Sequence, residues 1–191
     1  KEDYTGYVRK VRSHLYLFDV ATRSVQPLTA GGFDEVQPAW SPDGKRIAFV
    51  SKRAGADPDR GDNWDIYVMD ATPGATARAI TTFTGPDLDP DWGEAPERSA
   101  DGRTILYHRN GPDSLIYYAG PRLATVPAAG GTERVLTEAL DRHTMNPRWS
   151  ADGRWICFLA DRRPEPWYEE PLNQLYAVSP DLEAPTEGAE L

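Results

Sequence analysis

The chain has little cysteine, fewer positively than negatively charged residues, and no long apolar run. Its 191 residues include a single cysteine, Cys157, so no disulfide can form within the chain and nothing demands an oxidising compartment. The net charge of −9 argues against a nucleic-acid surface, because phosphate binding needs clustered lysine and arginine. No uninterrupted apolar stretch is long enough to cross a bilayer. These absences exclude the nucleic-acid and membrane-spanning classes and favour an acidic protein in solution.

Helical periodicity is also missing, since no segment carries an apolar series at helical spacing. The 16 glycines and 17 prolines are spread over the whole length, which marks many turns instead of one flexible linker. Aromatic residues make up 10% of the chain and favour packed strands. We therefore expect an all-β fold.

One stretch recurs along the chain. It reads W-S-P-D-G-K-R-I-A-F-V-S over residues 40–51, returns degraded over 99–107, and returns almost intact over 149–159. A period of about 50 residues indicates a repeat architecture. In each copy an Asp-Gly pair marks a tight turn, because aspartate bonds nearby amides and glycine tolerates a positive φ.

The repeat predicts the blades of a β-propeller. Within Arg46–Ser51 the apolar residues follow one another without alternating polar residues, so we expect this strand to be buried on both faces. Four short antiparallel strands per unit, with doubly buried inner strands, are typical of a propeller blade. The predicted blades span 36–86, 87–143 and, in part, 144–191, and residues 1–35 would supply the outer strands of another. This count fits either a minimal four-bladed ring closed by pairing its ends or an incomplete part of a larger ring of seven or eight blades, and the strands missing at both ends favour the larger ring.

The repeat P-x-W-S-P-D-G-K-R-I-A-F-V-S, followed by D-I-Y-V-M-D-A, resembles the TolB-type propeller repeat. That family includes the periplasmic TolB proteins and the propeller domains of prolyl oligopeptidase-type serine peptidases. The inserted segment Leu115–Pro127 is similar to the acylaminoacyl-peptidase and dipeptidyl-peptidase-like branch and is not expected in TolB. The resemblance covers nearly all of residues 6–179.

In the peptidases the propeller precedes an α/β-hydrolase domain with a Ser-Asp-His triad and restricts access to small peptides. None of the eight serines of this chain lies in G-x-S-x-G, the elbow that exposes an activated hydroxyl. The resemblance therefore implies a noncatalytic portion that gates peptide substrates and packs on a hydrolase domain outside this chain. For such a protein we expect a cytoplasmic location and no cofactor, and the composition already argues against a nucleic-acid or membrane partner.

Two alternatives stay open. A TolB-like propeller would bind a protein in the periplasm, whereas a small stand-alone propeller would bind a sugar or a peptide. An open arc of blades would expose sheet faces and edges. We therefore also expect a partner or self-association.

Candidate substrate-gating residues gather before an innermost strand and in the insertion. Carboxylates there could face the central channel and repel acidic peptides or hold a substrate amino terminus. Alternatively they only form turns and contact no substrate, and this second role is favoured. The candidates are Asp87, Asp89, Asp91, Tyr117, Tyr118 and Arg122.

Other chemically suggestive residues receive structural interpretations. The acidic loop 57–65 has oxygen ligands at alternating positions but does not fit the EF-hand spacing, so we expect no metal. The three histidines are expected to be structural or surface residues, although a Ser-His-Asp site is recognised by geometry and not by sequence order. Trp40, Trp92 and Trp149 hold the same repeat position and are expected to pack blade against blade. Cys157 lies in an apolar run and is expected to be an inert core thiol.

Overall fold

The protein is built from antiparallel sheets that follow one another in chain order. The computed structural model describes residues 11–93, 104–112, 114–115, 119–140, 142–161 and 173–179. Within these ranges every regular element is a strand, which confirms the all-β prediction. The degraded turn at Asp101 and two candidates of the insertion, Tyr117 and Tyr118, lie outside the described residues.

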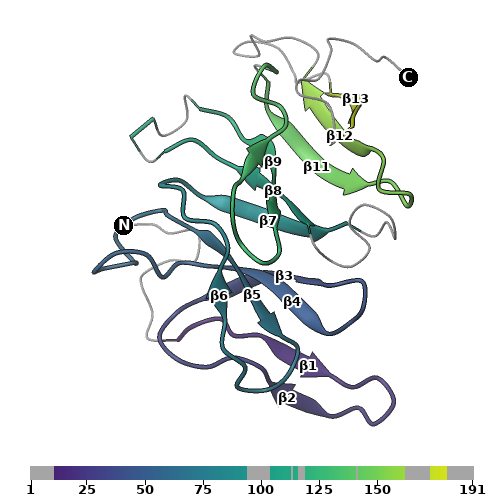
Figure 1. Cartoon of the computed structure of the whole chain (residues 1–191). Coiled ribbons are helices and arrows are strands. Elements are labelled where there is room, and N and C mark those ends of the chain that lie inside the picture. Colours follow the sequence, from purple (N-terminus) through teal and green to yellow (C-terminus); the bar gives the residue numbers. More distant parts are fainter. Residues whose placement is uncertain are drawn as a thin grey trace.

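Thirteen strands form four sheets (Figure 1). The first sheet pairs β1 (Tyr16–Phe18) with β2 (Val25–Pro27). The second has the order β3 (Glu35–Trp40), β4 (Arg46–Ser51), β5 (Asp65–Asp70) and β6 (Arg78–Ala79). The third has the order β7 (Asp87–Trp92), β8 (Thr104–Arg109), β9 (Arg122–Pro127) and β10 (Arg134–Val135). The fourth contains β11 (Thr144–Trp149), β12 (Ile156–Asp161) and β13 (Asn173–Val178).

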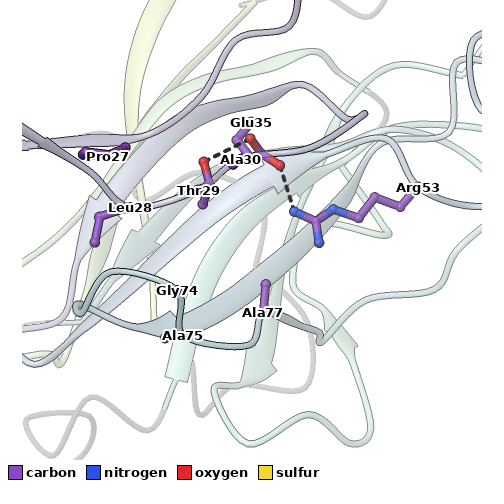
Figure 2. Close-up of a pocket in the computed structure, with 9 residues that line it drawn as sticks. All are labelled: Pro27, Leu28, Thr29, Ala30, Glu35, Arg53, Gly74, Ala75 and Ala77. Atoms are coloured by element: carbon purple, nitrogen blue, oxygen red, sulfur yellow. Dashed lines mark hydrogen bonds and ion pairs between the residues drawn. The ribbon is translucent and has the colours of Figure 1, made fainter.

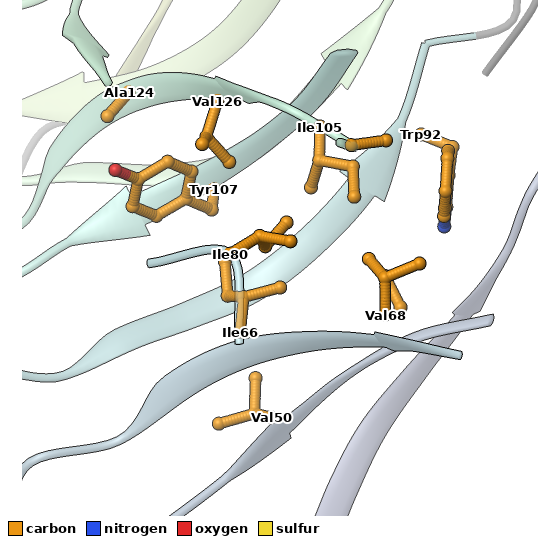
Figure 3. Packing of buried hydrophobic residues seen from close by; sticks show 11 residues of the cluster. Val50, Ile66, Val68, Ile80, Trp92, Ile105, Tyr107, Ala124 and Val126 are labelled. Carbon is orange, nitrogen blue, oxygen red and sulfur yellow. The ribbon is translucent and has the colours of Figure 1, made fainter. Parts of the chain in front are cut away.

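The second strand of each full sheet is buried on both faces, as its contiguous apolar run predicts. In β4, Ile47 and Phe49 pack toward the first sheet in a cluster with Leu15. Ala48 and Val50 face the other way and join the cluster shared with the third sheet (Figure 3). Alternate side chains of one strand thus enter two different cores, because successive residues of a strand point to opposite faces.

The Asp-Gly turn has the same hydrogen bonds in its two described copies. The Ser41 hydroxyl accepts a bond from Arg46 N at 2.9 Å, and Asp43 accepts one from Lys45 N at 3.0 Å. Ser150 and Asp152 repeat both bonds in the fourth sheet. The glycines that follow the aspartates have φ of 65° at position 44 and 63° at position 153. The predicted turn, including its positive φ, is confirmed.

Replacing Gly44 by valine is expected to destabilise the second sheet. A Cβ at Gly44 would meet no atom within 4 Å, so the cost comes from the backbone, which a β-branched residue adopts poorly at positive φ. We expect a loss of about 1–3 kcal/mol in the free energy of unfolding, measured by urea denaturation. Gly32, which has no such φ and an equally open surrounding, provides the control, and equal losses at both positions would contradict this explanation.

Two predictions about single side chains need correction. Trp40 is 52% exposed. Trp92, at the same repeat position, is covered by the inner strands of the preceding sheet. The sheet before Trp40 has only two described strands and no described counterpart of those inner strands, so Trp40 stays uncovered. Cys157 is only partly buried, because it lies on the face of β12 opposite Phe158, which joins the core shared with the third sheet. Trp92 does pack between sheets as predicted.

The described part of the chain contains no helix that is long and apolar enough to cross a membrane.

Candidate functional site

The innermost strands β3, β7 and β11 each carry a β-bulge at the same position. The pairing register shifts after Val36, Leu88 and Met145. The next residue in each strand has a positive φ: 50° at Gln37, 55° at Asp89 and 49° at Asn146. Bulges re-aim side chains and are common beside binding sites. All three side chains are exposed, so the bulges present a row of polar groups along neighbouring inner strands.

Side-chain hydrogen bonds join two of these bulges across the second and third sheets. Gln37 Nε2 donates to Asp89 Oδ1 at 2.7 Å, and Asp89 N donates to Gln37 Oε1 at 3.0 Å. These reciprocal bonds fix the orientation of both side chains. The other carboxylate oxygen, Asp89 Oδ2, lies 3.3 Å from His108 Nδ1.

Asp89 is the carboxylate of this row, whose other two members carry amides. Its side chain is 54% exposed, and the hydrogen bond from His108 holds the pKa of Asp89 below its usual value. His108 itself is buried, and its Nε2 has no hydrogen-bond partner among the described residues. Asp89 is therefore an anion at neutral pH, available to a cationic group that approaches the inner strands.

Asp87 lies in a different environment from Asp89 although only one residue separates them. It is fully buried, and neither carboxylate oxygen has a hydrogen-bond partner in the described structure. Burial, with the carboxylates of Glu133 and Asp65 nearby, raises the pKa of Asp87 to about 8. Burial likewise raises the pKa of Asp65 to about 6. Asp87 is thus a neutral acid between two sheets and has no access to solvent.

Glu35 occupies the repeat position of Asp87 in the preceding sheet and is fully partnered there. Its carboxylate accepts bonds from Arg53 Nη2 at 2.8 Å and Thr29 Oγ1 at 3.0 Å, and His14 Nδ1 lies 2.7 Å away (Figure 2). Glu35, Arg53 and Thr29 line a hollow of about 430 Å³, and Figure 2 shows their side chains with the hydrogen bonds between them. The remaining lining is mostly small and apolar: Pro27, Leu28, Ala30, Gly74, Ala75 and Ala77.

The other candidate residues lie apart from this row. Asp91 follows in β7 and is partly buried. Arg122 begins β9, and its Nη1 donates to the Glu138 carbonyl at 2.7 Å. Tyr117 and Tyr118 are not among the described residues. The structure thus separates the three aspartates into one buried acid, one exposed anion and one partly buried residue, and their role in gating stays a prediction.

The acidic loop 57–65 uses its carboxylates on other side chains. Asp59 Oδ1 accepts a bond from Arg12 Nη1 at 2.9 Å, and Asp62 accepts one from Trp64 Nε1 at 2.8 Å. Among the described residues no cluster of three or more histidine, cysteine or acidic side chains could hold a metal ion. The described carboxylates of Asp59 and Asp62 are thus engaged with Arg12 and Trp64.

The sequence analysis missed Gln37, Asn146 and His108. A signal for the first two was present, because each bulge residue is followed by a proline, at positions 38, 90 and 147. Proline cannot donate to a ladder and is found in strands at edges and bulges. His108 carried no such signal, since its contact with Asp89 depends on the register between β7 and β8.

The chain is similar in sequence to two curated bacterial peptidases. It is 27% identical over 192 residues to the uncharacterized peptidase YuxL of Bacillus subtilis, a match that covers 84% of this chain and 26% of that protein. It is 30% identical over 131 residues to dipeptidyl-peptidase 5 of Porphyromonas gingivalis, covering 66% of this chain and 18% of that protein. The chain thus spans about a quarter or less of the length of these relatives. No family model matches it.

Solved structures share the fold at lower identity. TolB from Acinetobacter baumannii superposes with a TM-score of 0.59 at 21% identity, over 87% of this chain and 35% of that one. A puromycin-hydrolyzing peptidase of Mycobacterium tuberculosis gives 0.63 at 16% identity, over 93% and 27%. A chain from a study of two prolyl endopeptidases gives 0.60 at 19% identity, over 89% and 25%. With TolB propellers and prolyl oligopeptidase-type peptidases as structural neighbours, and peptidases as curated relatives, the chain has the fold of part of a β-propeller, and its repeats are similar to those of TolB.

Proposed function

We propose that the chain is the noncatalytic propeller portion of a prolyl oligopeptidase-type serine peptidase. The observation that carries the proposal is the match to a peptidase over 84% of this chain and only 26% of that protein. Most of such a relative lies outside the match and has room for a catalytic domain. The sequence contains no G-x-S-x-G, and this supports a proposal in which hydrolysis is carried out by residues outside 1–191.

In this proposal the propeller controls which peptides reach an α/β-hydrolase domain of the same parent protein, on which it packs. The exposed polar row of Gln37, Asp89 and Asn146 supports such a role, because it offers amide groups and one anion to a passing peptide. Asp89 can pair with a substrate amino terminus or repel an acidic side chain. The buried Asp87 takes no part in contacts with substrate.

The proposal is tested by labelling with a fluorophosphonate probe, which reacts with activated serines. We expect the natural parent protein to be labelled and the 191-residue chain to remain unlabelled, because none of its serines lies in a nucleophile elbow. We also expect the parent protein to cleave dipeptide anilides much faster than an unfolded polypeptide. Stoichiometric labelling of the 191-residue chain, or a parent coding sequence without G-x-S-x-G followed by Asp and His, would overturn the proposal.

A TolB-like protein-binding propeller in the periplasm is the second candidate, supported by the fold shared with TolB at 21% identity. The same coding sequence separates the two functions. An upstream secretion signal with no downstream hydrolase domain would favour the TolB-like function, whereas a hydrolase domain with no such signal would favour a cytoplasmic peptidase.

A further inference from the structure

The hollow between the first and second sheets combines a few polar side chains with small apolar residues (Figure 2). Its volume of about 430 Å³ falls within the range of about 300–1,000 Å³ that is usual for small-molecule sites. Residues 27–30, at the end of β2, form one wall, and residues 74, 75 and 77, which precede β6, form the other. Both walls belong to described parts of two consecutive sheets. The hollow is therefore a feature of the contact between two blades and does not depend on further blades.

The repeat identifies the side chain that fills this place in the next interface. A threonine hydroxyl accepts a hydrogen bond from a backbone amide near the start of β1, β5 and β9, at 2.9 Å in each case. These threonines, Thr29, Thr81 and Thr137, align the first three sheets. Ala77 lies four residues before Thr81, and Glu133 lies four residues before Thr137. Glu133 in the third sheet therefore corresponds to Ala77 in the second, where Ala77 lines the hollow.

Glu133 places a carboxylate at the contact between the second and third sheets. The Tyr107 hydroxyl donates to Glu133 Oε2 at 2.9 Å, and Arg109 Nη1 lies 3.5 Å from the same oxygen. The charge of Glu133 also helps to raise the pKa of Asp65 in the second sheet, as expected for a carboxylate at this contact. Ala77 has only a methyl group at the corresponding position, so the place of that carboxylate is open between the first and second sheets.

An arginine reaches this open place although its position in the sequence differs from that of Arg109. Ser51 corresponds to Arg109, because each pairs with the acid that begins its innermost strand. Arg53 Nε donates to the Ser51 hydroxyl at 3.0 Å, which brings the guanidinium to the corresponding side of the contact. Arg53 Nη2 donates to Glu35 at 2.8 Å, whereas Nη1 has no hydrogen-bond partner among the described residues. Because Arg53 lines the hollow, it offers unused donors there.

The guanidinium of Arg53 is held in place by its surroundings. Its Cζ lies 4.6 Å from the ring centroid of Tyr67 and 5.6 Å from that of Phe49. Glu35 also contacts His14, whose Nδ1 lies 2.7 Å away, so Arg53 is one of two basic partners of that carboxylate. An arginine that is already oriented loses little freedom when it binds an acceptor. Arg53 can therefore bind a second carboxylate.

We propose that the hollow binds a small aliphatic carboxylate, which takes the place that Glu133 occupies in the next interface. Its carboxylate accepts hydrogen bonds from Nη1 of Arg53, and its hydrocarbon chain packs against Leu28, Ala75 and Ala77. Hydrogen bonds between arginine and a carboxylate are charge-assisted and therefore stronger than those to a neutral acceptor. The carboxylate belongs either to a free acid or to a glutamate side chain of a peptide. This inference does not depend on the proposed peptidase function.

The test is a titration of the 191-residue chain, isotope-labelled in its alanine methyl groups and observed by nuclear magnetic resonance. Butyrate represents a free acid, and an acetylated and amidated Ala-Glu-Ala peptide carries its carboxylate on a side chain. We expect butyrate to cause saturable shifts at Ala75 and Ala77. Butyramide has the same shape without the charge and should bind at least about tenfold more weakly, because neutral hydrogen bonds have about half the strength. Shifts with the peptide and not with butyrate would assign the site to peptide side chains and still support the proposal.

Ala77→Glu is the decisive variant because it gives the second sheet the side chain of the third. We expect it to stay folded and to abolish the butyrate-induced shifts at Ala75, since its own carboxylate occupies the site on Arg53. Thr76→Glu adds the same charge at an exposed neighbour that does not line the hollow, and it should bind butyrate like the wild type. Arg53→Gln should lower the affinity at least about tenfold, and circular dichroism checks the fold of each variant.

A wild-type chain without saturable shifts for either butyrate or the peptide would overturn the proposal, as would equal affinities for butyrate and butyramide. Butyrate binding retained in a folded Ala77→Glu protein would also overturn it. An unfolded Ala77→Glu protein would contradict the correspondence with Glu133 on which the proposal rests. If Arg53→Gln does not fold, the comparison of Ala77→Glu with Thr76→Glu decides alone.

Discussion

Replacing Trp92 by alanine is expected to lower the free energy of unfolding by about 3–5 kcal/mol. Only 3% of Trp92 is exposed, and its indole lies in the core shared by the second and third sheets (Figure 3). The Nε1 group donates to the Ala39 carbonyl at 2.9 Å, and the Arg46 guanidinium lies 5.0 Å from the ring centroid. Truncation removes buried apolar area, opens a cavity and leaves the Ala39 carbonyl without this donor.

Trp40 provides the matched control because it occupies the same repeat position. Its side chain is 52% exposed, so Trp40→Ala should cost less than about 1 kcal/mol, as surface substitutions usually do. A further variant, Trp92→Phe, keeps most of the buried area and loses the hydrogen bond, so we expect an intermediate loss. Urea unfolding followed by far-ultraviolet circular dichroism measures all three. Similar losses for Trp92→Ala and Trp40→Ala would show that packing between sheets does not set the stability at this position.

The same pair of tryptophans shows how far the repeat can be read from sequence. The turn motif predicts the strands on either side of it, and the contiguous run Arg46–Ser51 predicts burial on both faces, because both depend on local residue order. The motif also predicts that each tryptophan meets the preceding blade. It cannot give the exposure of Trp40, because that exposure depends on which strands the preceding sheet contains.

The candidate site was less accessible to sequence reasoning than the fold. Asp87 and Asp89 are the same residue type in one strand, so their residue type alone cannot show which of them is buried and which is exposed. Their environments differ because the bulge at Asp89 turns its side chain outward while Asp87 points between two sheets. A bulge changes which residues share a face, so regular alternation along the strand cannot place its side chains.

The contrast between Asp87 and Glu35 extends this argument to energetics. Both residues begin an innermost strand and both are buried. Glu35 is bonded to Arg53 and lies beside His14, whereas the position that corresponds to His14 in the next unit is Asp65. Burial without a cationic partner favours the neutral form of Asp87, and the neighbouring carboxylates of Glu133 and Asp65 add to this effect.

Replacing Asp87 by asparagine is expected to change the pH dependence of stability. The pKa of Asp87 is raised to about 8 in the folded protein from an ordinary value near 3.8. Between these values the unfolded chain has released the proton and the folded protein still holds it, so the wild type loses stability as pH rises from about 4 to about 8. The stabilising contribution of the protonated acid is complete below the lower value and lost above the upper one.

The asparagine side chain has no proton to release in this range, so Asp87→Asn removes this loss. We expect wild type and variant to have similar stability near pH 4, and the variant to be more stable near pH 8 by a few kcal/mol, since each pKa unit corresponds to about 1.4 kcal/mol. Thermal melting at a series of pH values measures the difference between the two proteins. Using the difference removes the effect of carboxylates distant from Asp87. Asp65, whose pKa is raised to about 6, acts on Asp87 directly and adds a similar but narrower trend.

Glu35→Gln is the matched control and should have the opposite effect at neutral pH. Arg53 donates to Oε1 of Glu35, while Thr29 and His14 contact Oε2. Glutamine replaces one of these oxygens by an amide donor and removes the negative charge, so we expect a loss of about 1–3 kcal/mol. Parallel melting curves of wild type and Asp87→Asn between pH 4 and pH 8 would show that Asp87 is ionised in the folded protein. If at pH 8 Glu35→Gln lowers the free energy of unfolding and Asp87→Asn raises it, the same repeat position carries a stabilising ion pair between the first two sheets and a protonated acid between the next two. The sequence repeat would then conserve the place of the acid while its neighbours decide its charge.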